Sequence, residues 1–231
     1  MPCRPALMLC LLLPLATHGA EGRPCANATE VVVAGVDGEA AVGEICTAAG
    51  RALDFLARLG LHLRRTITLT VVDRIVEVSG HPAYASYDSR SDAIQLMSYD
   101  AIFRRNNDPR MYDQPFDRNH YAGVVAHEVA HAVMNHNRSA QRMFAPPQEY
   151  LAHATQLAVM PAAARAALIR SKKVLPWESG DAVSDAYLAA DPGKFAVKSY
   201  LHLTGRADPA PLVQQLLRAQ GFSFIVPDDT D

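Results

Sequence analysis

Two histidines four positions apart, with a glutamate directly after the first, are the residues of this sequence best suited to chemistry. They are His127, Glu128 and His131. Residues four apart lie on one face of an α-helix, so both imidazoles can reach the same metal ion. Zinc suits two imidazoles and a carboxylate, and it lowers the pKa of a bound water to about 7. Glu128 lies one step round the helix, where its carboxylate can contact that water, so the spacing predicts a zinc site with Glu128 as general base.

The residues around this motif help to distinguish a buried site from the simpler alternative, two surface histidines on an amphipathic helix. Valines at positions 124, 125, 129 and 133 give the helix an apolar face, and alanines at 126, 130 and 132 allow close packing. With nine histidines in 231 residues, random order gives roughly 0.01 such motifs per chain. The metal site is therefore the preferred interpretation.

A catalytic zinc site needs a third protein ligand and an open coordination position. Glu149 follows His131 by 18 positions, which is enough for a loop and a second helix. His153 shares a helix face with Glu149, so it could lie behind that ligand or be the third ligand itself. We prefer Glu149 as the ligand, because His153 would be the ordinary choice only if Glu149 were exposed to solvent.

This arrangement resembles the gluzincin clan of zinc metallopeptidases, the thermolysin-like and aminopeptidase-like enzymes, over roughly residues 66–160. The resemblance implies one zinc ion held by His127, His131 and Glu149, with Glu128 as the general base. It also implies an edge strand that pairs with extended substrate, for which residues 93–97 are the candidate. The sequence departs from the clan at His153, because many gluzincins have an acidic residue there that orients the first histidine. The whole chain looks like an exported bacterial branch of the zincins.

The resemblance implies hydrolysis of a peptide or protein substrate. Zinc and Glu128 would activate a water for attack on a peptide carbonyl, and Glu128 would pass the proton to the leaving amine. His202 and Tyr200 are candidate donors to the oxyanion, with Tyr150 and Tyr187 as alternatives, although each could equally be a packing residue. Two other functions compete: a zinc-binding interaction module with little turnover, against which the retained base argues, and hydrolysis of a non-peptide amide.

The first 20 residues are typical of a secretory signal peptide, with Arg4 before an apolar run over 6–16 and small residues at 19 and 20. An uncleaved anchor or a buried first helix is the alternative. Cleavage would leave Cys25 and Cys46, and an even pair in an exported chain predicts a disulfide between the N-terminal segment and the first helix. Two free thiols would be expected only in the cytosol. The abundance of alanine, and of arginine over lysine, suggests a bacterial source and hence a periplasmic or secreted protein.

Composition limits the remaining classes of function. The chain is 49% hydrophobic and 20% charged, with a formal net charge of −2. This composition supports a globular core and argues against a disordered chain, a dedicated nucleic-acid binder or a multi-pass membrane protein. After signal cleavage no stable membrane span is expected, and the sequence does not indicate an oligomeric state.

The elements that must position these residues form an α+β fold, in which a small mixed sheet with an edge strand precedes a mainly helical C-terminal half. We expect a single zincin-like domain over 21–231, with the sheet and active-site helix in about 30–140 and the helical part in about 145–220. Asp117 or Asn119 is the expected N-cap of the active-site helix. The pattern predicts strands at 30–36, 65–78, 84–88 and 93–98, a loop at 104–119, and helices at 45–59, 121–135, 146–160, 162–171, 182–190, 195–203 and 211–220.

Overall fold

A computed structural model describes residues 22–36, 38–78, 80–138, 145–219, 221 and 223–227. The predicted signal peptide at 1–20 lies outside these residues. Within them, no helix has both the length and the apolar character needed to cross a membrane.

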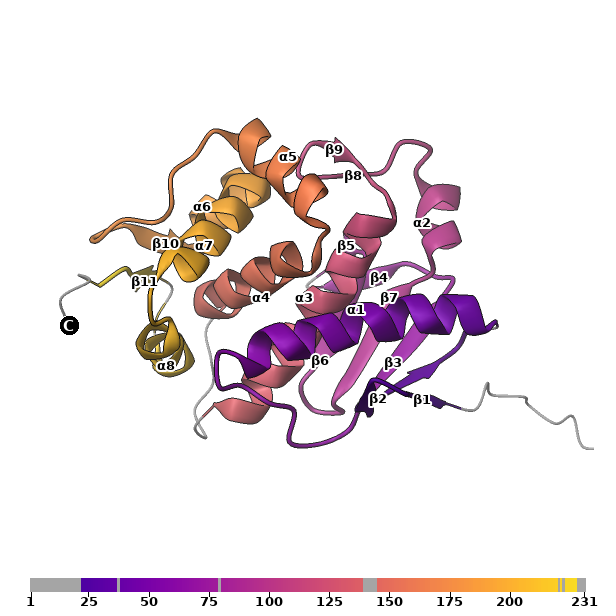
Figure 1. The fold of residues 1–231 in the computed structure, drawn as a ribbon. Coiled ribbons are helices and arrows are strands. Elements are labelled where there is room, and N and C mark those ends of the chain that lie inside the picture. Colours follow the sequence, from indigo (N-terminus) through magenta and orange to yellow (C-terminus); the bar gives the residue numbers. More distant parts are fainter. Residues whose placement is uncertain are drawn as a thin grey trace, which may run out of the picture.

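A five-stranded mixed sheet forms one end of the molecule, in the order β1-β2-β3-β7-β6 (Figure 1). Its central strands β2, β3 and β7 are parallel, and β1 and β6 pair antiparallel at the two edges. This confirms the predicted mixed sheet. The strands are β1 (Arg23–Cys25), β2 (Ala28–Ala34), β3 (Ile67–Val72), β6 (Ala85–Asp88) and β7 (Ala93–Met97).

The prediction that residues 93–97 form the edge strand is wrong. These residues are β7, which pairs with β3 on one side and with β6 on the other. The edge strand of the sheet is β6, because the chain turns back after Asp88 and inserts β7 between β6 and β3. Burial agrees with this order, since Ile94 and Leu96 in β7 are fully buried, whereas β6 is short and mostly polar, as edge strands commonly are.

Helix α1 (Glu39–Ala57) connects β2 to the parallel strand β3. It begins at Glu39, earlier than the predicted residue 45. The segment 39–44 has one large apolar residue, Val42, so the apolar repeat is evident only from Ile45. Gly60 adopts a left-handed backbone with φ +77° just after the helix, as expected for a helix end. A disulfide joins Cys25 at the end of β1 to Cys46 in α1, which confirms the predicted pair.

The connections between the sheet and the active-site helix hold more structure than the sequence suggested. The predicted strand over 65–78 ends at Val72, and β4 (Val76–Val78) forms a separate hairpin with β5 (His81–Ala83). The predicted loop over 104–119 is wrong in part. Helix α2 (Tyr99–Arg105) extends into it, capped by Ser98, and a second hairpin pairs β8 (Arg110–Met111) with β9 (Gln114–Pro115).

Helices make up most of the rest of the chain, and the α+β class is therefore confirmed. The predicted helix over 182–190 is wrong at its start, where β10 (Ala182–Ser184) pairs with β11 (Ser223–Ile225) before Ser184 caps α6. Figure 1 shows α3 and α4 between the sheet and the C-terminal helices. The helices are α3 (Arg118–Asn137), α4 (Ala145–Val159), α5 (Ala162–Lys172), α6 (Asp185–Ala190), α7 (Pro192–Gly205) and α8 (Ala210–Arg218).

One cluster of buried side chains runs through both parts of the described molecule. It joins Leu69 of the sheet, Val125 of α3, Leu151 of α4 and Phe195 of α7. Trp177 is also buried in it, with its indole Nε1 3.0 Å from Ser199 Oγ, so it is a packing residue. Because α3 packs against α1 on one side and α4 on the other, its position is fixed by the core.

Candidate metal centre

Helix α3 begins at the predicted capping residue. The carboxylate of Asp117 accepts hydrogen bonds from the backbone N–H and the ring of His120. His120 is buried and stacks on Phe116, so it belongs to the cap and lines neither of the hollows described below. The cap fixes the residue at which α3 begins. His127 lies two turns beyond the first turn of the helix, and His131 lies three turns beyond it.

The two histidines of the motif point their outer nitrogens at the same place. His127 Nε2 and His131 Nε2 lie 3.1 Å apart, and the rings meet edge to face. The valines and alanines between and beside them are fully buried in the core. Packing of the apolar faces of α3 therefore leaves the histidine face turned toward α4.

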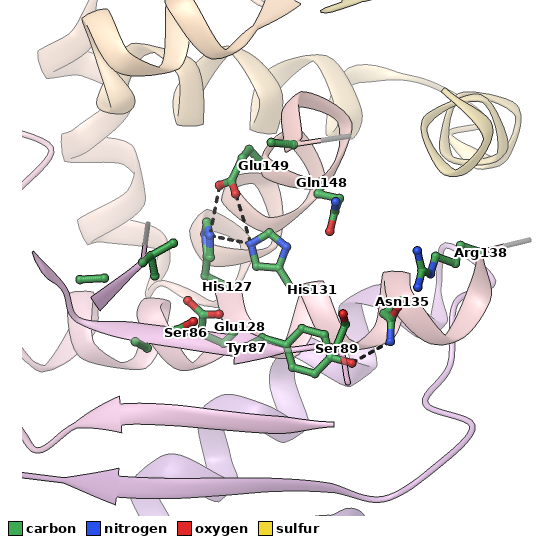
Figure 2. Close-up of a pocket in the computed structure, with 14 residues that line it drawn as sticks. Ser86, Tyr87, Ser89, His127, Glu128, His131, Asn135, Arg138, Gln148 and Glu149 are labelled. Atoms are coloured by element: carbon green, nitrogen blue, oxygen red, sulfur yellow. Dashed lines mark hydrogen bonds and ion pairs between the residues drawn. The ribbon is translucent and has the colours of Figure 1, made fainter. Parts of the chain in front are cut away.

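Glu149 brings its carboxylate to the same point from α4. Its Oε2 lies 3.3 Å from His127 Nε2, and its Oε1 lies 3.5 Å from His131 Nε2. One ligand atom from each of the three residues lies within 4.8 Å of the others (Figure 2). The structure thus brings together the three residues that the sequence selected as ligands, in an arrangement that could hold a metal ion.

His153 lies next to this group, with its ring edge to face against the ring of His127. Its Nε2 is 3.7 Å from Glu149 Oε2, and its Nδ1 is 2.7 Å from the hydroxyl of Tyr112. His153 is not one of the three residues whose ligand atoms converge. Of the two positions considered for His153, this geometry favours the one behind Glu149.

The ionisation of these groups suits a cation. Burial opposes the charged form of Glu149, but the neighbouring His131 and His127 outweigh it and hold the pKa of Glu149 far below its usual value. Burial lowers the pKa of His131, and burial together with His127 lowers the pKa of His153 to about 3. Burial also opposes protonation of His127, but Glu149 outweighs it and raises the pKa of His127. A charged carboxylate beside neutral imidazoles is the state that binds a metal ion, and a bound ion would take over the role of the proton on His127.

Two glutamines of α4 hydrogen-bond the two histidines, and the sequence reasoning missed both. His127 Nδ1 lies 3.2 Å from Gln156 Oε1, and Gln148 hydrogen-bonds the side chain of His131. Gln156 follows Glu149 by two helical turns and so lies on the same face of α4. Helical spacing from Glu149 was the signal that could have found Gln156.

Glu128 borders two hollows that flank the histidines. The larger is a cavity of about 570 Å³, with polar walls that include Ser86 of β6 and Asn135 of α3. The smaller, of about 330 Å³, has more apolar walls that include Met111 and Val124. His127 and Glu128 line both, and Glu128 is buried apart from this access. Figure 2 shows its carboxylate beside His127, on the side of Ser86.

The edge strand β6 is tied to α3 through Asp92 in the turn after it. The carboxylate of Asp92 accepts hydrogen bonds from Arg65, from the hydroxyl of Tyr87 at 2.6 Å and from His136 Nε2 at 2.8 Å. Asn135 of α3 in turn donates to the hydroxyl of Tyr87. Arg65, with help from Tyr87 and His136, holds the pKa of Asp92 well below its usual value. This network fixes one wall of the larger hollow relative to the histidines.

The two predicted oxyanion donors lie elsewhere. His202 Nδ1 is 2.7 Å from the hydroxyl of Tyr150, and His202 lines a separate hollow beside Trp177. Tyr200 packs under Arg165. Neither residue lines the hollows at His127.

Tyr112 borders the smaller hollow, and the prediction missed it because its hairpin was taken for a loop. Its backbone and that of Asp113 have positive φ values, 55° and 64°, in the turn between β8 and β9. Lys172 of α5 holds this turn through its Nζ, 2.6 Å from Asp113 Oδ2. The turn therefore has a defined position beside His153.

Comparison with known proteins gives a family for the chain. Residues 31–224 match the model of a family of unknown function (DUF6639). The chain belongs to this family. The match spans the sheet from β2 onward, the three converging residues and the C-terminal helices. No curated protein and no solved structure matches the chain.

Proposed function

We propose that this protein is an exported, zinc-dependent metallopeptidase with His127, His131 and Glu149 as ligands of one zinc ion. The observation that carries the proposal is the convergence of two imidazole nitrogens and a carboxylate beside a second carboxylate, Glu128, at an open hollow. Two nitrogens and one oxygen are a common donor set of catalytic zinc, and the hollow leaves room for water or substrate at a fourth position.

Each residue has a defined part in the proposed reaction. Zinc bound there would supply a Lewis acid for the attacking water and the peptide carbonyl. Glu128 takes the proton from the water as the new carbon–oxygen bond forms, and it then delivers this proton to the leaving amine as the peptide carbon–nitrogen bond breaks. The outer edge of β6, in place of the predicted residues 93–97, offers backbone groups to an extended peptide.

The exported location rests on two features. Residues 1–20 have the pattern of a signal peptide, and the Cys25–Cys46 disulfide fits an oxidising compartment such as the bacterial periplasm or the extracellular space. A peptide or protein substrate is consistent with a hollow that is open to solvent along β6.

Glu128→Gln tests the reaction separately from metal binding. The variant keeps the size and polarity of the side chain but cannot accept the proton, so we expect wild-type zinc content and loss of peptide hydrolysis. Zinc is measured by elemental analysis and hydrolysis with a fluorogenic peptide library. Glu178→Gln, in an exposed loop, is the matched control and should behave as wild type.

Three results would contradict the proposal. Unchanged turnover in Glu128→Gln would contradict the role of Glu128 as general base. A wild-type chain without zinc would contradict zinc as the cofactor. Full zinc content in Glu149→Ala would contradict the assignment of Glu149 as the third ligand. Stoichiometric zinc with no hydrolysis in the wild type would instead support the competing function, a zinc-binding interaction module.

A further inference from the structure

Gln156 is a buried polar side chain whose amide oxygen faces a metal-site histidine. It is 2% exposed, and its Oε1 lies 3.2 Å from His127 Nδ1. An amide oxygen only accepts hydrogen bonds, so Nδ1 of His127 must carry the proton. The lone pair of His127 is then on Nε2, the atom that faces His131 and Glu149.

The orientation of the Gln156 amide is itself fixed. Its Nε2 donates to Met111 Sδ at 3.0 Å, in the β8–β9 hairpin. A flipped amide would turn its N–H groups toward His127 and lose this contact. Met111 therefore selects the orientation in which the oxygen faces the imidazole.

Gly123 provides the space for the Gln156 side chain. It lies on α3, one turn before His127, and a Cβ atom there would come within 2.9 Å of Gln156 Cγ. That atom is in the middle of the side chain, so it cannot move away without moving the amide. The absence of a side chain at position 123 thus allows Gln156 to lie across α3.

We propose that Gln156 is a positioning residue that holds His127 in the tautomer and orientation needed to bind the metal, with Gly123 and Met111 holding Gln156. Ligand histidines commonly donate their second ring N–H to an oxygen acceptor, which fixes the ring and its tautomer. Here the acceptor is a neutral amide two turns beyond Glu149. His153 packs edge to face against His127, but its two ring nitrogens face Glu149 and Tyr112, so the acceptor at His127 Nδ1 is Gln156. The inference rests on the proposed zinc site but not on hydrolysis.

Zinc affinity of substituted full-length mature chains tests this role. Gln156→Leu removes the acceptor at similar size, and we expect zinc affinity to fall about 10- to 100-fold. Gln156→Glu keeps an oxygen at the same reach and should stay within about fivefold of wild type. Affinity is measured by competition with a chromophoric chelator. Gln214→Leu, on the exposed face of α8, is the matched control and should not change affinity.

A second measurement separates positioning from packing. In the metal-free protein, the Nδ1–H proton of His127 should give a slowly exchanging NMR signal that is lost in Gln156→Leu and kept in Gln156→Glu. Gly123→Ala should displace Gln156 and weaken both the signal and zinc binding. Circular dichroism and thermal unfolding of the metal-free variants establish that they are folded.

The outcomes distinguish this inference from the proposed function. A wild-type chain that binds no zinc overturns the proposed function and this role with it. Zinc binding of folded Gln156→Leu at wild-type affinity, or equal losses in the Leu and Glu variants, overturns the positioning role alone.

Discussion

At the scale of single residues, the candidate metal centre is built from groups that restrict each other. His127, His131 and Glu149 converge, while Gln156 and His153 lie behind them. His127 and His131 could be predicted because spacing of four on a helix fixes which side chains share a face, and Glu149 was selected through the resemblance to the gluzincins. Tyr112 could not be singled out, since tyrosines are common and only the packing of α4 and the β8–β9 hairpin shows what it touches. Gln156 shares the helix face of Glu149, but spacing alone does not show that it contacts His127.

Tyr112→Phe should weaken the site without abolishing it. Its hydroxyl lies 2.7 Å from His153 Nδ1, so the change leaves a buried ring nitrogen without this partner, at a cost of about 1–2 kcal/mol in unfolding free energy. Zinc affinity should fall by less than in Gln156→Leu, because His153 contacts Glu149 and does not bind the metal in our assignment. Chemical denaturation of the metal-free protein and chelator competition measure the two effects. A larger loss of zinc affinity in Tyr112→Phe than in Gln156→Leu would indicate that His153 is itself a ligand.

At the scale of elements, the order of the strands was the main feature that the sequence did not reveal. Strand positions follow from alternating apolar residues, but partners depend on contacts far apart in the chain. The segment 93–97 was taken for the edge strand that the gluzincin resemblance implies, whereas its buried Ile94 and Leu96 and its two partner strands place it inside the sheet. The helix with the metal motif was predictable to within a few residues, because Asp117 is a strong N-cap and the apolar residues continue to Met134, close to the helix end at Asn137.

Asp92→Asn should loosen the link between β6 and α3. The carboxylate accepts hydrogen bonds from Arg65, Tyr87 and His136, and its loss should lower the unfolding free energy by about 1–2 kcal/mol at neutral pH. Asp54→Asn, on an exposed position of α1, is the control with the same charge change. Chemical denaturation measures both. Equal stability of the two variants at neutral pH would show that the network adds nothing.

The lowered pKa of Asp92 predicts how the stability difference between wild type and Asp92→Asn depends on pH. The pKa of Asp92 is lower in the folded protein than in the unfolded chain, so its ionised form stabilises the fold above the unfolded pKa of about 3.9. That stabilisation is lost as the pH falls toward the folded pKa. The stability difference between wild type and Asp92→Asn should therefore be full at neutral pH and shrink below about pH 4. A difference that grows in acid would contradict this assignment.

At the scale of the whole molecule, a disulfide fastens the N-terminal strand to the helix that covers the sheet. Cys25 and Cys46 are 21 residues apart, and closing a loop of this size stabilises the fold by about 3 kcal/mol in the chain-entropy model. Replacing both cysteines with serine should lower the unfolding free energy by about that amount. Denaturation with and without reductant provides the measurement, and reductant should then affect the wild type but not the variant.

Metal should also stabilise the whole molecule, because its proposed ligands come from two helices that pack together. Zinc that binds only the folded chain adds about 2.7 kcal/mol when its free concentration is 100 times the Kd. The melting temperature should rise with added zinc and fall with a chelator, and Glu149→Ala should not respond. A wild-type melting temperature that does not change with added zinc would argue against a preformed site across α3 and α4.

The placement of ligands on both α3 and α4 has a consequence for the life of the protein in its compartment. If the site binds metal as proposed, a chain that lacks the ion would unfold more often and be exposed to the proteases around it, while a loaded chain would survive. The amount of protein would then follow the local supply of the ion without any dedicated sensor. Starvation for metal would remove the protein itself as well as its activity.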